Sequence, residues 1–266
     1  MNVIKKYFPI AATLLYAAHS FAQTDVKPEK VSHAEPLYYD LVRDLDARKG
    51  EKEFNAALDF SKKKDYNEYV FLAEYEFAPI NRIGFEVEAD FSFLGNSSGS
   101  VGSPVNKIEA LRFSTQYSFF VSTRLKTTLA VGYTQIIEFN EYRNIAKNRL
   151  VTGTVYNPFF VAAKRWGAHF NTLIYAYPLI EHDFVTNKLD VNWQINTSLL
   201  YTLPGTKHFA GLEFNKEINN GKFEMTLRPQ VKLKLDDHTA IGFVAGIPME
   251  RSNEDFSAFL RIIYEP

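Results

Sequence analysis

Acidic residues alternate with apolar residues along two neighbouring stretches of the chain. In residues 82–93, RIGFEVEADFSF, apolar side chains occupy every second position and most positions between them are acidic. Residues 68–77 repeat the pattern. Because successive side chains of a strand point to opposite faces, this alternation gathers the carboxylates on one face. The first candidates for a functional site are therefore Glu74, Glu76, Glu86, Glu88 and Asp90.

Basic residues occupy equivalent positions in other alternating stretches. They are Arg112, Arg228, Lys232, Lys234 and Arg261. Two interpretations follow if both sets face one enclosed space. Facing charges can create a transverse field that orients polar or zwitterionic solutes in a pore. Alternatively, the charges pair and close the space with salt bridges, because a buried charge is tolerated when it is paired.

Two other motifs could carry chemistry, and we interpret both as loops. Residues 95–99, GNSSG, match the nucleophile motif G-x-S-x-G, which requires a strand-to-helix turn, and no helix follows here. His182-Asp183 lacks the spaced partners that a metal site needs. His169 and His208 fall near turns predicted at the opposite end from an outer active site. We predict no catalytic residue, metal site or cofactor, and no enzymatic activity.

The elements that position these residues are predicted to be strands. About twelve stretches have a period of two, and each is long enough for the roughly 9–11 residues with which a tilted strand crosses a bilayer. An even strand number suits a single-chain bacterial barrel. The stretches are residues 52–60, 69–77, 82–93, 111–119, 126–138, 158–165, 168–177, 189–201, 208–216, 223–234, 239–247 and 256–264.

The connections and aromatic residues favour a membrane barrel over a soluble β-sandwich or lipocalin-like barrel. Short breaks alternate with longer ones, which we predict at residues 61–67, 94–106, 139–151, 178–187 and 248–255. Outer-membrane barrels have short periplasmic turns and longer external loops. Aromatic residues at strand ends are expected to face lipid at the two interfaces. They are Phe77, Phe119, Trp193, Tyr201 and Tyr264.

The N-terminal residues indicate export. Lys5 and Lys6 precede an apolar run, and Ser20-Phe21-Ala22 supplies small residues for cleavage, so residues 1–22 are predicted to be a signal peptide. Residues 23–50 are predicted to be a lead followed by a periplasmic amphipathic helix, and residues 51–266 to be the barrel. Leu37, Tyr38, Leu41, Val42 and Leu45 recur at helical spacing over residues 37–48.

Two positions are open for this helix. It could enter the periplasmic mouth of the barrel as a plug. It could also lie against the turns or the membrane surface, as amphipathic helices do, and we favour this second position.

Composition excludes several classes of function. The formal net charge is -1, which gives no general attraction to nucleic acid. The absence of cysteine excludes a disulfide framework and thiolate metal sites.

The chain resembles the outer-membrane β-barrel proteins of Gram-negative bacteria over residues 51–266. The segment HAEPLYYDLVRDLDARKGEKEFN looks like the opening of an uncharacterised group of such barrels. The resemblance implies outer-membrane lipid and the barrel-insertion machinery as partners. That machinery usually reads a final aromatic residue, whereas here Glu265 and Pro266 follow Tyr264.

We therefore expect an all-β, antiparallel up-and-down transmembrane barrel of about twelve strands with one short N-terminal helix. Its expected function is a narrow channel or transporter that passes small polar solutes through a charged lumen. The alternatives are a structural or adhesive barrel with a salt-bridged core and a barrel enzyme that modifies lipids of the outer leaflet.

Overall fold

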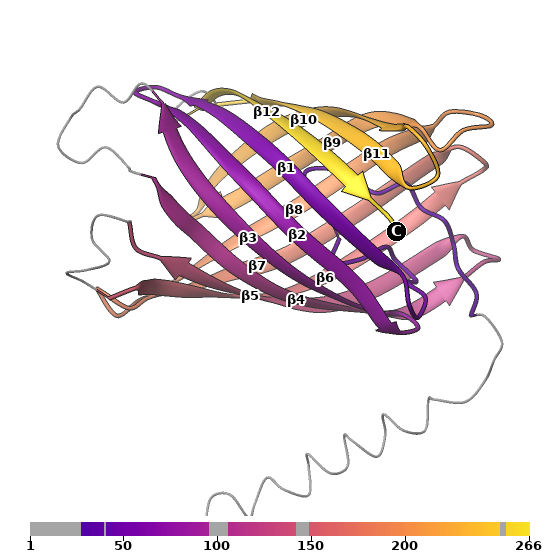
Figure 1. The fold of residues 1–266 in the computed structure, drawn as a ribbon, viewed down its shortest axis with the longest axis horizontal. Coiled ribbons are helices and arrows are strands. Elements are labelled where there is room, and N and C mark those ends of the chain that lie inside the picture. Colours follow the sequence, from indigo (N-terminus) through magenta and orange to yellow (C-terminus); the bar gives the residue numbers. More distant parts are fainter. Residues whose placement is uncertain (1–27, 40, 96–105, 142–148, 251–253) are drawn as a thin grey trace, which may run out of the picture.

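Twelve antiparallel strands form a closed barrel, in which β1 pairs with both β2 and β12 (Figure 1). The computed structural model describes residues 28–39, 41–95, 106–141, 149–250 and 254–266, so the predicted signal peptide and residues 96–99 of the GNSSG motif lie outside the described residues. The strands are β1 (Lys52–Lys63), β2 (Asn67–Ile80), β3 (Ile83–Gly95), β4 (Lys107–Ser122), β5 (Thr127–Phe139), β6 (Val151–Trp166), β7 (Phe170–Asp183), β8 (Lys188–Thr202), β9 (Phe209–Asn219), β10 (Lys222–Lys234), β11 (Thr239–Pro248) and β12 (Glu254–Tyr264).

The period-two pattern of the sequence explains why these strands form a barrel. Tyr117 is 45% exposed on the outer surface, whereas the adjacent Ser118 is 1% exposed inside. The same alternation runs through β3, where Phe85 and Val87 are exposed and Glu86 and Glu88 are buried. The predicted twelve-stranded antiparallel barrel is confirmed. Among the described residues, no helix is long and apolar enough to cross a membrane.

The connections differ from the predicted alternation of short and long. We call the end that carries residues 51 and 265 the terminal end, and the opposite end the loop end. The connections 96–106 and 140–150 at the loop end are long, as predicted. Residues 178–183, predicted to be part of a loop, instead extend β7. At residues 219–221, Asn220 and Gly221 both adopt positive φ, the conformation of a two-residue hairpin turn.

Residues 28–39 and 41–50, here called the lumen segment, lie at the terminal end of the barrel, and the part around Leu37, Leu41 and Leu45 packs in its interior (Figure 1). Leu41 and Leu45 are each 1% exposed. They pack with residues of β5, β6 and β7, whereas Leu37 packs with residues of β11, β12 and β1. The apolar side chains of the segment therefore contact opposite walls of the barrel.

The predicted helix over residues 37–48 is wrong for the described residues, which form bends and turns; Asp40 lies outside them. Barrel side chains bond the backbone groups that a helix would pair internally. Gln116 donates a hydrogen bond to the Arg43 carbonyl at 2.8 Å, and Ser118 accepts one from the Asp46 amide at 3.1 Å. A helix with one apolar face could not make contacts with both walls. Because the segment contacts both walls from inside, the favoured position outside the barrel is also wrong for these residues.

Small residues on the inner wall make room for the lumen segment. A Cβ atom at Gly84 would lie 2.6 Å from the Cβ atom of Arg43, and one at Gly242 would lie 2.7 Å from Leu37. Ala130 and Ala240 also face inward and are fully buried against the segment. The inner wall at the terminal end thus fits the segment at close packing distance.

Candidate functional site

Arg43 of the lumen segment is the basic centre of an acidic cluster. Its Nη1 atom lies 2.6 Å from Glu53 Oε2 and 3.4 Å from Glu76 Oε2. Gln116 donates a hydrogen bond to the Arg43 carbonyl at 2.8 Å. Burial alone would lower the pKa of Arg43, but the carboxylates of Asp44, Glu53 and Glu76 raise it above its usual value. The guanidinium therefore stays charged and holds the segment to β1 and β2.

Arg261 of β12 extends this cluster from the other side of β1. Its Nη2 atom lies 2.9 Å from Glu74 Oε1 and 3.7 Å from Glu76 Oε1. Asn55 donates hydrogen bonds to both carboxylates at 2.9 Å. Because β12 and β2 both pair with β1, barrel closure brings Arg261 within reach of Glu74.

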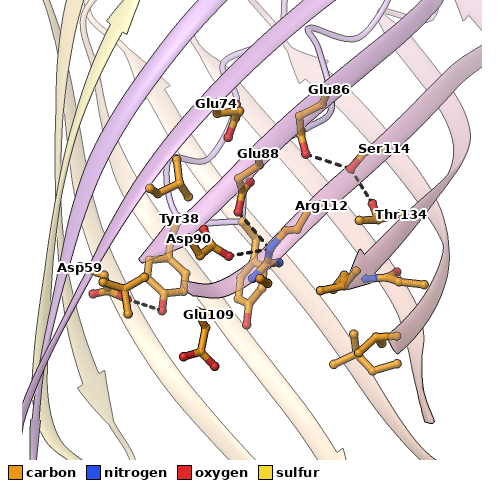
Figure 2. A pocket seen from close by; sticks show the side chains of 18 of the residues that line it. Tyr38, Asp59, Glu74, Glu86, Glu88, Asp90, Glu109, Arg112, Ser114 and Thr134 are labelled. Atoms are coloured by element: carbon orange, nitrogen blue, oxygen red, sulfur yellow. Dashed lines mark hydrogen bonds and ion pairs between the residues drawn. The ribbon is translucent and has the colours of Figure 1, made fainter. Parts of the chain in front are cut away.

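Arg112 of β4 pairs with the remaining carboxylates of β3 (Figure 2). Its Nε atom lies 3.0 Å from Glu88 Oε1 and 2.9 Å from Asp90 Oδ2. Ser114 donates a hydrogen bond to Glu86 at 2.9 Å (Figure 2). Each predicted acidic candidate therefore has a partner on a neighbouring element.

The other basic candidates do not form a wall opposite these carboxylates. Arg228 bonds Asn215 at 2.6 Å, and its guanidinium lies 3.3 Å from the ring centre of Tyr38. Lys232 lines a small space at the terminal end beside Glu35. Lys234 lies 3.7 Å from Glu265, the residue after β12. The basic side chains are thus dispersed among different partners.

Three carboxylates of the acidic cluster, those of Glu74, Glu76 and Glu86, have oxygen atoms within 4.8 Å of one another, close enough to hold a metal ion. Glu74 and Glu76, however, accept hydrogen bonds from Asn55 and face Arg261, and Glu86 accepts one from Ser114. All three carboxylates thus have hydrogen-bond partners among the described residues, and Glu74 and Glu76 also have ion pairs.

A cavity of about 500 Å³, here called the vestibule, lies above the lumen segment toward the loop end. Tyr38 and Tyr39 of the segment line it together with Tyr175 and Tyr177 of β7. Arg112 and Arg261 are the basic residues among its described lining. The carboxylates of that lining are Asp59, Glu68, Glu74, Glu86, Glu88, Asp90, Glu109, Glu138 and Glu181. The vestibule is therefore strongly acidic.

The histidines considered in the sequence analysis form hydrogen bonds with residues in turns or at strand ends. His182 bonds Asn187 at 3.2 Å, and Asp183 accepts hydrogen bonds from the Val185 and Thr186 amides. His169 lies 3.2 Å from the carbonyl of Thr202. His208 Nδ1 accepts a hydrogen bond from the Lys234 amide at 3.0 Å.

The residues predicted to form aromatic girdles lie on the outer surface. Trp193 and Tyr264 are close to half exposed, and Phe77 is half-buried beside the rings of Tyr75 and Phe85. Phe119 and Tyr201 are exposed near the terminal end.

Sequence reasoning missed the contribution of the lumen segment to the site. Tyr38 and Tyr39 were assigned to a helix outside the barrel, yet both line the vestibule. His33 Nε2 lies 3.1 Å from Thr128 Oγ1, and Thr128 donates a hydrogen bond to Asp46 at 3.0 Å. The available signal was the apolar content of the segment, since six hydrophobic side chains among residues 37–45 need a large surface to cover them.

Comparisons with known proteins agree with this architecture. The COG4313 outer membrane channel from Pseudomonas putida F1 is similar, with 13% identity, a TM-score of 0.60, and coverage of 84% of this chain and 98% of that one. The KdgM porin is similar over 80% of this chain and 98% of that one, with 11% identity and a TM-score of 0.55.

At these identities the similarity establishes a porin-like fold alone. No curated protein matches the chain. The model of the HAEPLYID-like family matches residues 29–265, and the chain therefore belongs to that family.

Proposed function

We propose that the protein is an outer-membrane channel for small polar solutes whose terminal end is closed by the lumen segment. The observation that carries this proposal is the vestibule of about 500 Å³ inside the barrel. A twelve-stranded barrel is wider than the eight-stranded barrels that side chains can fill. Here the lumen segment occupies part of the lumen, and charged, polar and apolar side chains together line the rest.

The proposed orientation places the loop end outside the cell and the terminal end in the periplasm. The long connections 96–106 and 140–150 lie at the loop end, where outer-membrane barrels carry their external loops. The lumen segment would then follow a cleaved signal peptide and enter the barrel from the periplasm.

A structural barrel with a closed core is the second candidate. The ion pairs of Arg43 and Arg261 favour it, because they join the segment, β12 and β2 across the terminal end. A lipid-modifying enzyme has less support. His169 and His208, the histidines considered for such a role, bond backbone groups of Thr202 and Lys234 near the terminal end.

Single-channel conductance tests the proposal. The mature chain from Gln23 and a chain lacking residues 23–50 are refolded and inserted into planar bilayers. We expect low or intermittent conductance from the full chain and steady conductance from the truncated one, because truncation removes the side chains that fill the terminal end.

Heat-dependent migration in gel electrophoresis shows that both barrels have folded. If neither folded form conducts, the channel is rejected and the structural barrel is favoured. Equal steady conductance of both would retain the channel and reject the lumen segment as its closure.

A further inference from the structure

We propose that the vestibule binds an organic cation that carries two or more amino groups, such as a diamine or polyamine. This inference rests on the proposed channel function and names the class of solute. The carboxylates of the vestibule outnumber its guanidinium groups, nine to two, among the described residues that line it.

The acidic excess persists at the loop end after the ion pairs are counted. Arg112 is shared by Glu88 and Asp90, and Arg261 faces Glu74. Two lysines outside the lining reach two more carboxylates: Lys63 lies 3.9 Å from Glu68, and Lys107 lies 2.8 Å from Glu109. Glu138 of β5 and Glu181 of β7, by contrast, form no ion pair with any described lysine or arginine. A cationic ligand would supply the charge that these two carboxylates lack.

Gly153 of β6 leaves space for one of these carboxylates. A Cβ atom at position 153 would collide with Glu138 Oε2. The absence of a side chain on β6 thus allows the Glu138 carboxylate to lie across that strand.

Tyrosine rings from the lumen segment and β7 form the floor of the vestibule. The ring centres of Tyr39 and Tyr177 are 6.3 Å apart, and those of Tyr177 and Tyr175 are 5.0 Å apart. Aromatic faces attract ammonium groups and also cover the methylene chain between them.

An unused hydrogen-bond acceptor supports a ligand with N–H donors. Asn157 of β6 lines the vestibule, is 7% exposed, and its Oδ1 atom has no hydrogen-bond partner among the described residues. Asp59 also lines the vestibule, and its Oδ1 atom likewise has no hydrogen-bond partner among the described residues. Its other carboxylate oxygen accepts a hydrogen bond from Tyr38. Buried acceptors of this kind are normally satisfied, so both sites are available to an amino group.

The geometry favours an extended organic cation over a single metal ion. Glu138 and Glu181 lie on β5 and β7, with β6 between them. They are absent from the carboxylate group that is close enough to hold one ion, which lies deeper in the barrel. The volume of about 500 Å³ falls in the range of small-molecule pockets. A polyanion such as the oligogalacturonate with which the KdgM porin was solved would meet repulsion here.

Calorimetric titration of spermidine into the refolded mature chain in zwitterionic detergent tests the inference. We expect saturable binding that Glu138→Gln and Glu181→Gln each weaken about tenfold, the effect of losing one favourable charge contact. Asp65→Asn is the matched control, because it removes a carboxylate from an exposed residue between β1 and β2 outside the vestibule. Succinate and maltose serve as the anionic and the neutral control ligand.

Equal binding by both glutamine variants and the wild type, no binding of spermidine, or tighter binding of maltose would overturn the inference. These outcomes are independent of conductance. A channel that conducts without binding spermidine would refute the cation site alone. A barrel that does not conduct but binds spermidine through Glu138 and Glu181 would refute only the proposed channel function.

Discussion

Arg43 illustrates how one residue can tie a segment to the barrel. It is 3% exposed and reaches Glu53 and Glu76 on two neighbouring strands. Removing one partner of a buried ion pair typically costs 3–5 kcal/mol because the other charge stays buried. Departure of the segment would take this partner from Glu53, whereas Glu76 would keep Arg261 at 3.7 Å. The loss at Glu53 therefore favours the docked state at neutral pH.

His33 makes docking of the lumen segment sensitive to pH. Burial, with a smaller contribution from Arg165, lowers the pKa of His33 to about 4. A released segment would regain the usual value near 6.5. Above pH 6.5 the His33 side chain is neutral in both the docked and the released segment. As the pH falls from 6.5 toward 4, the released state binds the proton first, so docking weakens.

The prediction is that the segment is released more readily at pH 5 than at pH 7. Trypsin cleavage after Arg43, followed by mass spectrometry, measures the release. His33→Asn should flatten this dependence, because its side chain can bond Thr128 but does not titrate. Burial also raises the pKa of Asp46, which opposes the His33 effect at lower pH. An unchanged pH dependence in the variant would assign it to another group.

At the scale of elements, the lumen segment and the inner wall fit each other without regular secondary structure. Backbone bonds join them at several points: the Arg82 amide donates to the Ala47 carbonyl at 2.6 Å, and the Gly50 amide donates to the Ala78 carbonyl at 2.8 Å. Lys30 of the segment also lies 3.0 Å from Glu51 Oε1. These contacts anchor both ends of the segment near the terminal end of the barrel.

Gly84→Val should displace the segment while leaving the barrel intact. The new side chain would occupy the position of the Arg43 Cβ atom, which is fixed to the segment backbone and cannot rotate away. We expect faster trypsin cleavage after Arg43 and a higher channel conductance. Ala89→Val, on the outer face of the same strand, is the matched control and should change neither. Equal cleavage of the two variants would contradict the close packing at Gly84.

At the scale of the whole molecule, closure between the first and last strands creates both the lumen and its ion pairs. Ala56 of β1 lies opposite Ile262 of β12 in this register. A shift of one residue would turn Arg261 from the lumen to the lipid, because side chains alternate between the two faces.

The register predicts that cysteines at Ala56 and Ile262 form a disulfide in the folded barrel. The natural chain has no cysteine, so no native thiol competes with the two new ones. In the control Ala56→Cys with Ala258→Cys, the second cysteine lies four residues before Ile262 on β12, roughly 14 Å from it at 3.4 Å per residue. This exceeds the reach of a disulfide. Cross-linking of the control pair instead would mean a different closure register.

The sequence alone determined the barrel and the face on which the acidic residues lie. Strand periodicity is a local property: Phe85 and Glu86 point to opposite faces wherever the strand is placed. That local rule was sufficient to predict the strands and to place Glu86, Glu88 and Asp90 together inside.

Only the tertiary structure decided the path of the lumen segment and the partners of the charges. Arg261 bonds the Leu37 carbonyl across a separation of 224 residues. Such a contact depends on barrel closure and on the width of the lumen, neither of which periodicity specifies. Helical spacing in residues 37–45 was misleading because a segment inside a barrel buries side chains on several walls, whereas a surface helix buries one face. The acidic vestibule exists because that segment fills the terminal end, whereas the described side chains leave a cavity of about 500 Å³ toward the loop end.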